Sequence, residues 1–413
     1  MKKRYQHGMA LAMCLSLLCG CAASGREYTA QVPKTVKYSD DNIDAWSENK
    51  QELANQYEGY ADDMDPFYEK MTSTLLAKEK NGVISPLNLY MAMGMLAKTS
   101  AGQTQAQILD VLNQKDTDAL EKKVNALWLA TYSDDGRMTS RLANSLWLDE
   151  GFQYKEATLK ALAEDFHASS MIGKMGSDAF NERLHTWMNE NTGDLLKKEV
   201  ADVNWSDQTR LGLVSTLYYQ NTWTSKFDAA QNTHETFHGR SDEKAEFMHG
   251  QMTVPYVKTD AYEAIALPMD DGARMWLYKP VDSPNAVWSE RKSDEGERRI
   301  VNVSLPKFDV AATMQLKDAW EALGITDVFD ASKADFSPLS DEDLVLSSVE
   351  HGARVKVDES GVEGGAYTVM SIEATSLIEE EPVDFTLDRP FAFTIESADG
   401  SLLFAGQVYS LDA

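Results

Sequence analysis

The feature that most constrains this chain is an alternating stretch near its C-terminal end. From Val362 to Ala374, every second residue is small or apolar except Thr368, whereas the residues between them are mixed and partly charged. Because successive side chains of a β-strand point to opposite faces, the pattern predicts a strand with one buriable face and one wettable face. Its 13 residues are more than twice the usual strand length of about 5–6.

The two ends of this stretch are poor material for a permanent strand. Gly361, Gly364 and Gly365 leave the backbone loose, and an acidic run of three glutamates ends at Pro382. The pattern therefore predicts a segment that can become a strand without starting as one. An ordinary edge strand or loop is the alternative that periodicity alone leaves open.

Size and charge limit the class of protein. The 413 residues can hold one large domain or two to three ordinary ones, and 43% apolar and 25% charged residues are typical of a globular protein. The formal net charge of −27 at pH 7 repels nucleic acid and favours basic partners. Nucleic-acid binding is therefore not expected.

Residues 1–21 have the pattern of a targeting signal. A basic start precedes an apolar run from Met9 to Leu18, which is too short to span a bilayer and has the length of a signal-peptide core. The ending, from Leu18 to Cys21, resembles a bacterial lipobox, although Cys19 stands where Ala or Ser is usual. We expect lipidation of Cys21 and a location outside the cytoplasm, at the bacterial cell surface or periplasmic face. An ordinary secretory signal is the alternative.

The segment after this signal predicts a spacer. Residues 22–58 are polar and acidic with little apolar periodicity, so we expect a flexible tether to the membrane anchor. All three cysteines lie within residues 1–21, so a chain lipidated at Cys21 has no free thiol and no disulfide in its folded part.

Short motifs then follow in a fixed order from about Tyr60 to Val408. They are Ile84-Ser85-Pro86-Leu87, Gly102-x-Thr104-x-x-Gln107-Ile108, Ala143-Asn144-Ser145-Leu146-Trp147, Thr209-Arg210-Leu211, Ser304-Leu305-Pro306-Lys307-Phe308, Asp388-Arg389-Pro390-Phe391 and Phe404-Ala405-Gly406. In order and spacing, these motifs resemble the serpin family of protease inhibitors. The resemblance implies an α+β fold, with about eight or fewer helices around three β-sheets and an exposed reactive-centre loop.

The resemblance also implies how the chain is divided. It predicts a serpin domain over residues 59–413, with a reactive-centre loop at about 359–384, no cofactor, no metal and a monomer. Only a short polar link is expected between Val281 and Val301, where serpins usually carry two more helices. Ser215 stands where the family usually has asparagine and Asn88 where it usually has serine. The two changes can compensate each other.

The alternating stretch matches the family's loop hinge. The hinge residues implied are Glu359, Ser360, Gly361, Val362, Glu363, Gly364, Gly365 and Ala366. Val362 would point inward, and it carries neither the charge nor the proline that marks serpins without inhibitory activity. The resemblance also implies a shutter and breach, the regions where the sheet opens, formed by Ser85, Asn88, Ser215, His351 and Trp223.

The family's loop length places the scissile bond at Thr375-Ser376, with Met370-Ser371 as the main alternative and Glu373-Ala374 as a further one. Small residues before the bond favour elastase-like serine proteases. The implied function is irreversible inhibition through a covalent acyl-enzyme complex, without a catalytic residue. A non-inhibitory binding or structural protein, or an inhibitor of cysteine proteases, is the alternative.

Two motifs suggest enzymes. His234-Glu235-Thr236-Phe237-His238 has the spacing of a zinc peptidase, which requires a helix, but its neighbours disfavour a helix and we expect an extended segment. Asp358-Glu359-Ser360-Gly361 faintly resembles the nucleophile loop of trypsin-like proteases, yet only His351 is near in sequence. Neither motif therefore predicts an enzyme.

Overall fold

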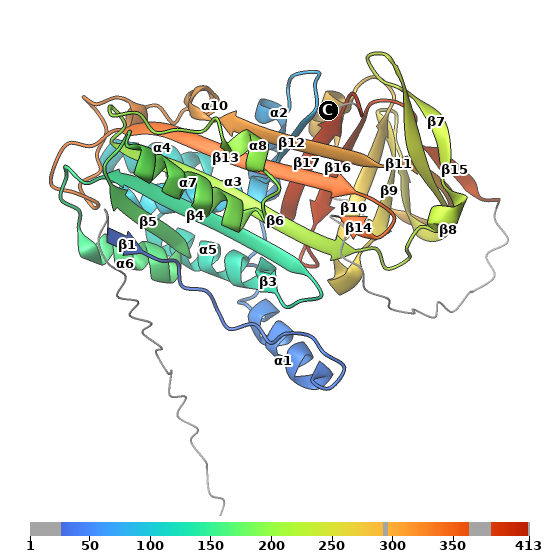
Figure 1. Cartoon of the computed structure of the whole chain (residues 1–413), viewed down its shortest axis with the longest axis horizontal. Coiled ribbons are helices and arrows are strands. Elements are labelled where there is room, and N and C mark those ends of the chain that lie inside the picture. Colours follow the sequence, from blue (N-terminus) through green and yellow to red (C-terminus); the bar gives the residue numbers. More distant parts are fainter. Residues whose placement is uncertain (1–25, 292–295, 363–380, 412–413) are drawn as a thin grey trace, which may run out of the picture.

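The computed structural model describes residues 26–291, 296–362 and 381–411. The described residues form two large β-sheets with most helices gathered around the first sheet (Figure 1). The first sheet has the spatial order β1 (Arg26–Tyr28), β5 (Ala168–Gly173), β4 (Thr139–Asp149), β6 (Leu211–Thr222), β14 (Gly361–Val362), β13 (Leu346–Val357) and β12 (Phe308–Gln315), with β3 (Ser133–Asp134) paired to β4.

The second sheet lies beside the first. Its order is β15 (Val383–Thr386), β11 (Glu297–Pro306), β8 (Asp242–Lys258), β9 (Tyr262–Pro268), β10 (Arg274–Pro280), β16 (Phe391–Glu396), β17 (Leu402–Val408) and β2 (Gly82–Ile84), with β7 (Thr233–His238) paired to β8. Short 3₁₀ turns connect some elements: η1 (Ala229–Gln231), η2 (Asp270–Gly272) and η3 (Asp327–Phe329).

The helices pack mainly on the two faces of the first sheet. They are α1 (Ile43–Ala54), α2 (Asp65–Leu75), α3 (Pro86–Thr99), α4 (Gly102–Val111), α5 (Thr117–Thr131), α6 (Glu156–Asp165), α7 (Asp178–Asn191), α8 (Lys197–Val200), α9 (Pro284–Glu290) and α10 (Lys317–Ala322). Figure 1 shows α7 lying across the outer face of the first sheet. Within the described residues, no helix is long and apolar enough to cross a membrane.

The central helix is α3, which is apolar on nearly all sides. It begins where the Ser85 hydroxyl accepts a hydrogen bond from the Asn88 amide and where Pro86 takes the first turn, at which its missing N–H costs nothing. A helix that is apolar all round belongs in a core. All residues of α3 except Lys98 are buried, in agreement with that rule. This helix places its first turn beneath the middle of the first sheet.

The α+β fold is as expected, but the numbers of helices and sheets are not. Two hydrogen-bonded sheets are described where three were expected, because the 17-residue strand β8 pairs with β7 and β11 along much of its length and with β9 at its end. Helices α1 to α10 exceed the expected eight or fewer. One of them, α9, lies in the link after Val281, which therefore is not only a short polar connection. Val287 and Trp288 bury against the core there.

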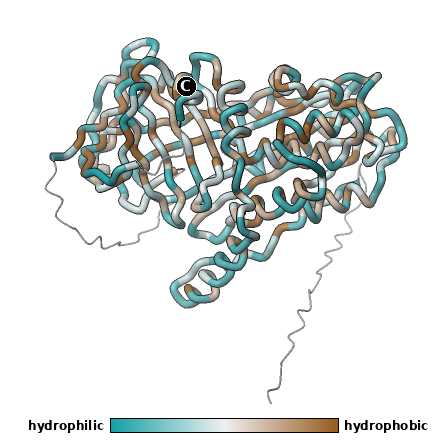
Figure 2. The backbone as a smooth tube through the Cα atoms, turned by 180° about the vertical axis from the view of Figure 1, so that it is seen from behind, coloured by the Kyte–Doolittle hydropathy of each residue, from teal (hydrophilic) through white to brown (hydrophobic). Residues whose placement is uncertain are grey.

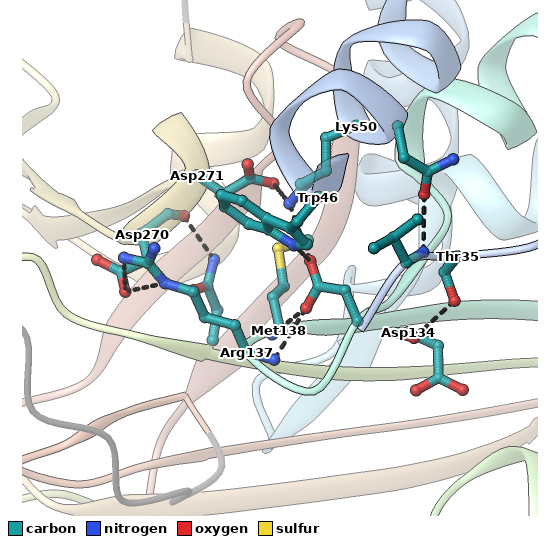
Figure 3. Close-up of polar contacts among 12 residues, drawn as sticks. Thr35, Trp46, Lys50, Asp134, Arg137, Met138, Asp270 and Asp271 are labelled. Carbon is teal, nitrogen blue, oxygen red and sulfur yellow. Dashed lines mark hydrogen bonds and ion pairs between the residues drawn. The ribbon is translucent and has the colours of Figure 1, made fainter. Parts of the chain in front are cut away.

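The segment expected to be a flexible tether differs most. From residue 26 onward it is packed: β1 pairs antiparallel with β5 and forms the edge of the first sheet, and α1 contacts α5. Trp46 donates a hydrogen bond from Nε1 to Asp135 at 2.9 Å, and Lys50 lies 2.8 Å from Asp271 (Figure 3). The composition of residues 22–58 does not predict this packing, because α1 has no buried residue. Figure 2 shows α1 as a largely hydrophilic helix.

Candidate functional site

Gly361 and Val362, two of the residues expected at the hinge, lie in the first sheet. They form β14, in which Gly361 is opposite Thr222 and Val362 opposite Asn221 on β6, while Val362 is also opposite Val357 on β13. The Val362 side chain is 1% exposed. A side chain at Gly361 would collide with the carbonyl of Asn221, so glycine is required for this close approach.

Below β14, the neighbouring strands β6 and β13 pair directly with each other and then separate. Their direct parallel ladder runs from Leu346 opposite Leu211 to Gly352 opposite Thr216. Between that point and β14, the described residues of the two strands form no ladder with each other. The first sheet is therefore forked, with β14 between the two arms.

Backbone bonds fix the turn that precedes β14. The Trp223 amide donates to the Ser360 carbonyl at 3.0 Å, and the indole Nε1 donates to the Asp358 carbonyl at 2.9 Å. The Phe227 amide donates to the Glu359 carbonyl at 3.2 Å. Trp223 thus holds the turn from both its backbone and its ring, directly after the end of β6.

A charged cluster anchors Glu359. Its carboxylate lies 2.6 Å from the Lys307 ammonium and accepts a hydrogen bond from the Asn232 amide at 2.5 Å, and Lys307 also lies 3.0 Å from Glu246. Burial alone would raise the pKa of Glu359, but the bonds from Lys307 and Asn232 outweigh it and the net pKa is lowered. The cluster therefore favours the ionised form of Glu359.

The residues expected at the shutter meet beneath the fork. The Ser85 amide donates to Nε2 of His351 at 3.0 Å, and His351 lies opposite Ser215 in the sheet. Nδ2 of Asn88 donates to the Thr216 carbonyl at 2.6 Å, and Oδ1 of Asn88 accepts from Asn144 at 2.9 Å. Asn88 therefore links α3 to both β4 and β6, from a helix position where serine is usual in the family.

Several residues of this region were not expected from the sequence. Asn144 lay within a recognised motif without an assigned role, and Lys307, Asn232 and Asn221 come from segments distant from the hinge in sequence. The contacts depend on strand register, which no local pattern specifies. The sequence offers a signal for two of these residues: Asn144 and Asn221 are polar residues inside otherwise apolar strands.

The two enzyme-like motifs take other structures. His234 and His238 lie on the strand β7, as the expected extended conformation requires, and no group of three potential ligands among the described residues can hold a metal ion. His351 is fully buried and accepts from Ser85, so it is not available as a base for Ser360. The geometry supports neither a zinc peptidase nor a trypsin-like triad at these residues.

Other expected site residues lie outside the described residues. They are Cys21, Glu363, Gly364, Gly365, Ala366, Met370, Ser371, Thr375 and Ser376, together with the further alternative bond Glu373-Ala374.

Comparisons with known proteins agree with this fold. The family model described as Serpin (serine protease inhibitor) matches residues 66–411. Iripin-5 from Ixodes ricinus is 30% identical over 359 residues, covering 81% of this chain and 90% of the relative. Serpin-ZX from Arabidopsis thaliana is 25% identical over 369 residues, covering 82% and 94%.

Solved structures show the same architecture. The crystal structure of a thermophilic serpin, Tengpin, in the native state has a TM-score of 0.76 at 23% identity and covers 93% of this chain and 97% of that chain. The native stressed conformation of AtSerpin1 from Arabidopsis has a TM-score of 0.74 at 22% identity, with coverages of 88% and 98%. Since the family match spans most of the chain, this protein belongs to the serpin family, whose members are generally protease inhibitors.

Proposed function

We propose that this protein is an irreversible suicide-substrate inhibitor of serine proteases. A protease attacks the loop of about residues 359–384 and forms its acyl-enzyme. The freed loop then inserts between β6 and β13, and the displaced protease cannot complete deacylation. The protein contributes no catalytic residue, because the work comes from the stability released when the sheet gains a strand.

The observation that carries this proposal is the place of Val362. It is buried in the ladder between β6 and β13, at the open end of the forked sheet. Each further large side chain that enters the core stabilises the inserted form by about 1.5–3 kcal/mol, beside new ladder hydrogen bonds. A hinge with a charged residue at position 362 would lose the stabilisation that a buried apolar side chain gives.

The target class follows from the loop sequence. Ala374 and Thr375 are small, so cleavage at Thr375-Ser376 suits elastase-like proteases with shallow pockets, and Met370-Ser371 is the alternative bond. The net charge of −27 favours encounter with basic proteases. We further propose that the protein acts as a monomer.

We also propose that the mature protein is a bacterial lipoprotein. The lipobox-like ending at Cys21 supports acylation and an extracytoplasmic location at the membrane surface. Globomycin treatment of expressing cells tests this: an accumulated larger precursor supports lipidation, and an unchanged precursor size contradicts it.

The inhibitor proposal is tested by incubating residues 22–413 with neutrophil elastase, and in parallel with a papain-like cysteine protease, before denaturing electrophoresis. A band at the summed mass that survives boiling supports covalent trapping, and the mass of the released peptide identifies the scissile bond. Cleavage by every protease tried without any such band contradicts it and favours a non-inhibitory serpin. A boiling-resistant band with the cysteine protease alone would identify cysteine proteases, and not serine proteases, as the targets.

A further inference from the structure

A cavity of about 410 Å³ lies between α1 and the main core, which is the large cluster of buried apolar residues around α3. Besides α1, its lining comes from the end of α5, from Tyr219 on β6, from Leu403 on β17 and from the turn 397–399. Cavities of about 300–1,000 Å³ are typical of sites that bind small molecules. The volume therefore suits a small organic ligand.

The way in which α1 docks explains why this space is not filled. The half-buried residues Trp46, Asn49, Lys50 and Leu53 recur at helical spacing and form the inner face of α1. Asn49 Oδ1 accepts a hydrogen bond from the Val36 amide at 2.9 Å, and Trp46 and Lys50 make the polar contacts described above. Of the α1 residues that line the cavity, only Leu53 has a large apolar side chain. The helix therefore covers the cavity without filling it.

The wall that the main core supplies is apolar and aromatic. Met138, Tyr219 and Leu403 are buried, belong to the main core and line the cavity. Tyr132, which also lines the cavity, stacks on Trp128 with 4.5 Å between the ring centroids. Such a wall favours a ligand with an apolar or aromatic body, because that body leaves water on binding.

The charged side chains that line the cavity are mostly acidic. They are the carboxylates of Asp135, Asp271 and Asp399 and the ammonium of Lys50, a formal excess of two negative charges. Burial alone would raise the pKa of Asp135, but a hydrogen bond from the Met138 amide and the charge of Lys50 help to outweigh it, and the net pKa is lowered. Because apolar walls weaken the screening of charges, the cavity favours a cation and repels an anion.

Asp271 is the carboxylate with capacity for a further partner. Asp135 and Asp399 each accept three hydrogen bonds from protein groups. The Asp271 carboxylate has one partner among the described residues, the Lys50 ammonium at 2.8 Å from Oδ2 (Figure 3). The Asp271 side chain is 34% exposed, so a ligand can reach it from solvent. Oδ1 of Asp271 is therefore available to a second cation.

Asp271 also lies near the aromatic wall. Burial raises the pKa of Tyr219, and the charge of Asp271 raises it further. A carboxylate whose charge acts on this ring is close enough for one small ligand to contact both groups. The cavity therefore combines a charged anchor with an apolar surface.

We propose that this cavity is a binding site for an organic cation, a primary amine attached to an apolar or aromatic body. The ammonium pairs with Oδ1 of Asp271, and the body lies against Tyr219 and Leu403. The Lys50 ammonium stays on Oδ2, where it keeps α1 over the cavity. None of these residues belongs to the loop of about residues 359–384, so the site does not rest on the inhibitor proposal.

Isothermal titration calorimetry with ligands of different charge tests this. Residues 22–413, with the loop intact, are titrated with tryptamine, with neutral tryptophol and with anionic indole-3-acetate, which share an indole ring. We expect tryptamine to bind about fivefold more tightly than tryptophol, and indole-3-acetate to bind more weakly than both. Binding of tryptophol or indole-3-acetate as tightly as tryptamine, or no binding of tryptamine at millimolar concentration, overturns the proposal.

Asp271→Asn tests which residue pairs with the ammonium. Asp271 has a φ of 72°, a left-handed conformation that asparagine also adopts, so the substitution removes the charge without straining the turn. The affinity for tryptamine should fall about fivefold, to that of tryptophol, whose own affinity should not change. Asp343→Asn is the matched control, because Asp343 is exposed and does not line the cavity. Equal tryptamine affinities of the two variants contradict the role of Asp271.

Ala54→Trp tests the location of the site. Ala54 is exposed at the end of α1 and lines the cavity, so a large side chain there occupies the cavity without replacing a core residue. This variant should lose the binding of tryptamine and of tryptophol alike, with an unchanged circular dichroism spectrum. Unchanged tryptamine binding would place the ligand elsewhere and overturn the proposal.

Discussion

The Nζ of Lys307 lies 2.6 Å from Oε1 of Glu359, so the residue between β11 and β12 holds the hinge turn. The side chains are 31% and 18% exposed, which places the pair at the border between surface and interior. We predict that Lys307→Met lowers the unfolding free energy of the intact protein by about 1 kcal/mol. Guanidinium denaturation checks this, with Lys258→Met as the control because Lys258 pairs with Glu263 in the β8–β9 hairpin.

The same pair has a defined pH dependence. Since the pKa of folded Glu359 is lowered, its stabilising contribution is complete above the unfolded value of about 4.5 and is lost as the pH falls through the folded pKa. Glu359→Gln should therefore show a shallower loss of stability below pH 4.5 than the unsubstituted protein. Equal pH profiles would show that the cluster does not hold the hinge.

His351 should give a second pH dependence at higher pH. Burial lowers its pKa to about 4, against a smaller opposite effect of the nearby Ser215 backbone. As the pH falls, His351 binds a proton near pH 6.5 in the unfolded protein but only near pH 4 in the folded protein. The unfolding free energy therefore decreases between about pH 6.5 and 4, by roughly 1.4 kcal/mol per pH unit. His351→Gln should remove this slope in thermal unfolding, whereas His238→Gln, at an exposed site, should keep it.

A charge at position 362 should let the protease cleave the loop but reduce the fraction of protease that is trapped. Val362→Glu places a carboxylate at a position that is buried in the main core, and a buried unpaired charge is strongly disfavoured. We expect at least a tenfold rise in the cleaved-to-complexed ratio on denaturing gels with elastase. Val362→Ala serves as the size control, with a smaller rise. An unchanged ratio for the glutamate variant would mean that burial of this residue in the sheet is not needed for inhibition.

The packed N-terminal segment should contribute to stability. Trp46 bonds Asp135, whose backbone carbonyl also accepts from the Tyr38 amide, and Arg137 beside it pairs with Asp270 at 3.0 Å (Figure 3). Trp46→Ala should lower the unfolding free energy by about 1–2 kcal/mol. Ile43→Ala, at an exposed position on the same helix, is the matched control and should change it little. Equal effects of both substitutions would indicate that α1 is not docked in solution.

The sequence predicts the fold well where residues act through short patterns. Gly361, the Ser85-Pro86 helix start and the buried Val362 carry local signals of backbone freedom, capping and apolar alternation. The docking of α1 has no such signal, because its contacts come from a few polar side chains meeting carboxylates far along the chain. The joining of two expected sheets by β8 likewise depends on how far a strand continues, which composition does not specify.

In the candidate site too, some contacts follow from sequence patterns and others do not. Ser85 and His351 are joined by a hydrogen bond, but the contacts of Asn88 with β4 and β6 became visible only when α3 and these two strands were placed together. Strand register brings Asn144, Ser215 and His351 into one row, and register is set by the whole sheet and not by any one strand. These contacts therefore require the three-dimensional structure.

The central claim is that the first sheet accepts the loop as a new strand, and thermal unfolding before and after loop cleavage tests it most directly. Residues 22–413 are cleaved once in the loop with elastase, and the intact and cleaved proteins are heated in parallel while circular dichroism is recorded. We predict a large upward shift of the midpoint temperature in the cleaved protein, because several inward side chains after Val362 enter the core. An equal or lower midpoint in the cleaved protein would contradict the account.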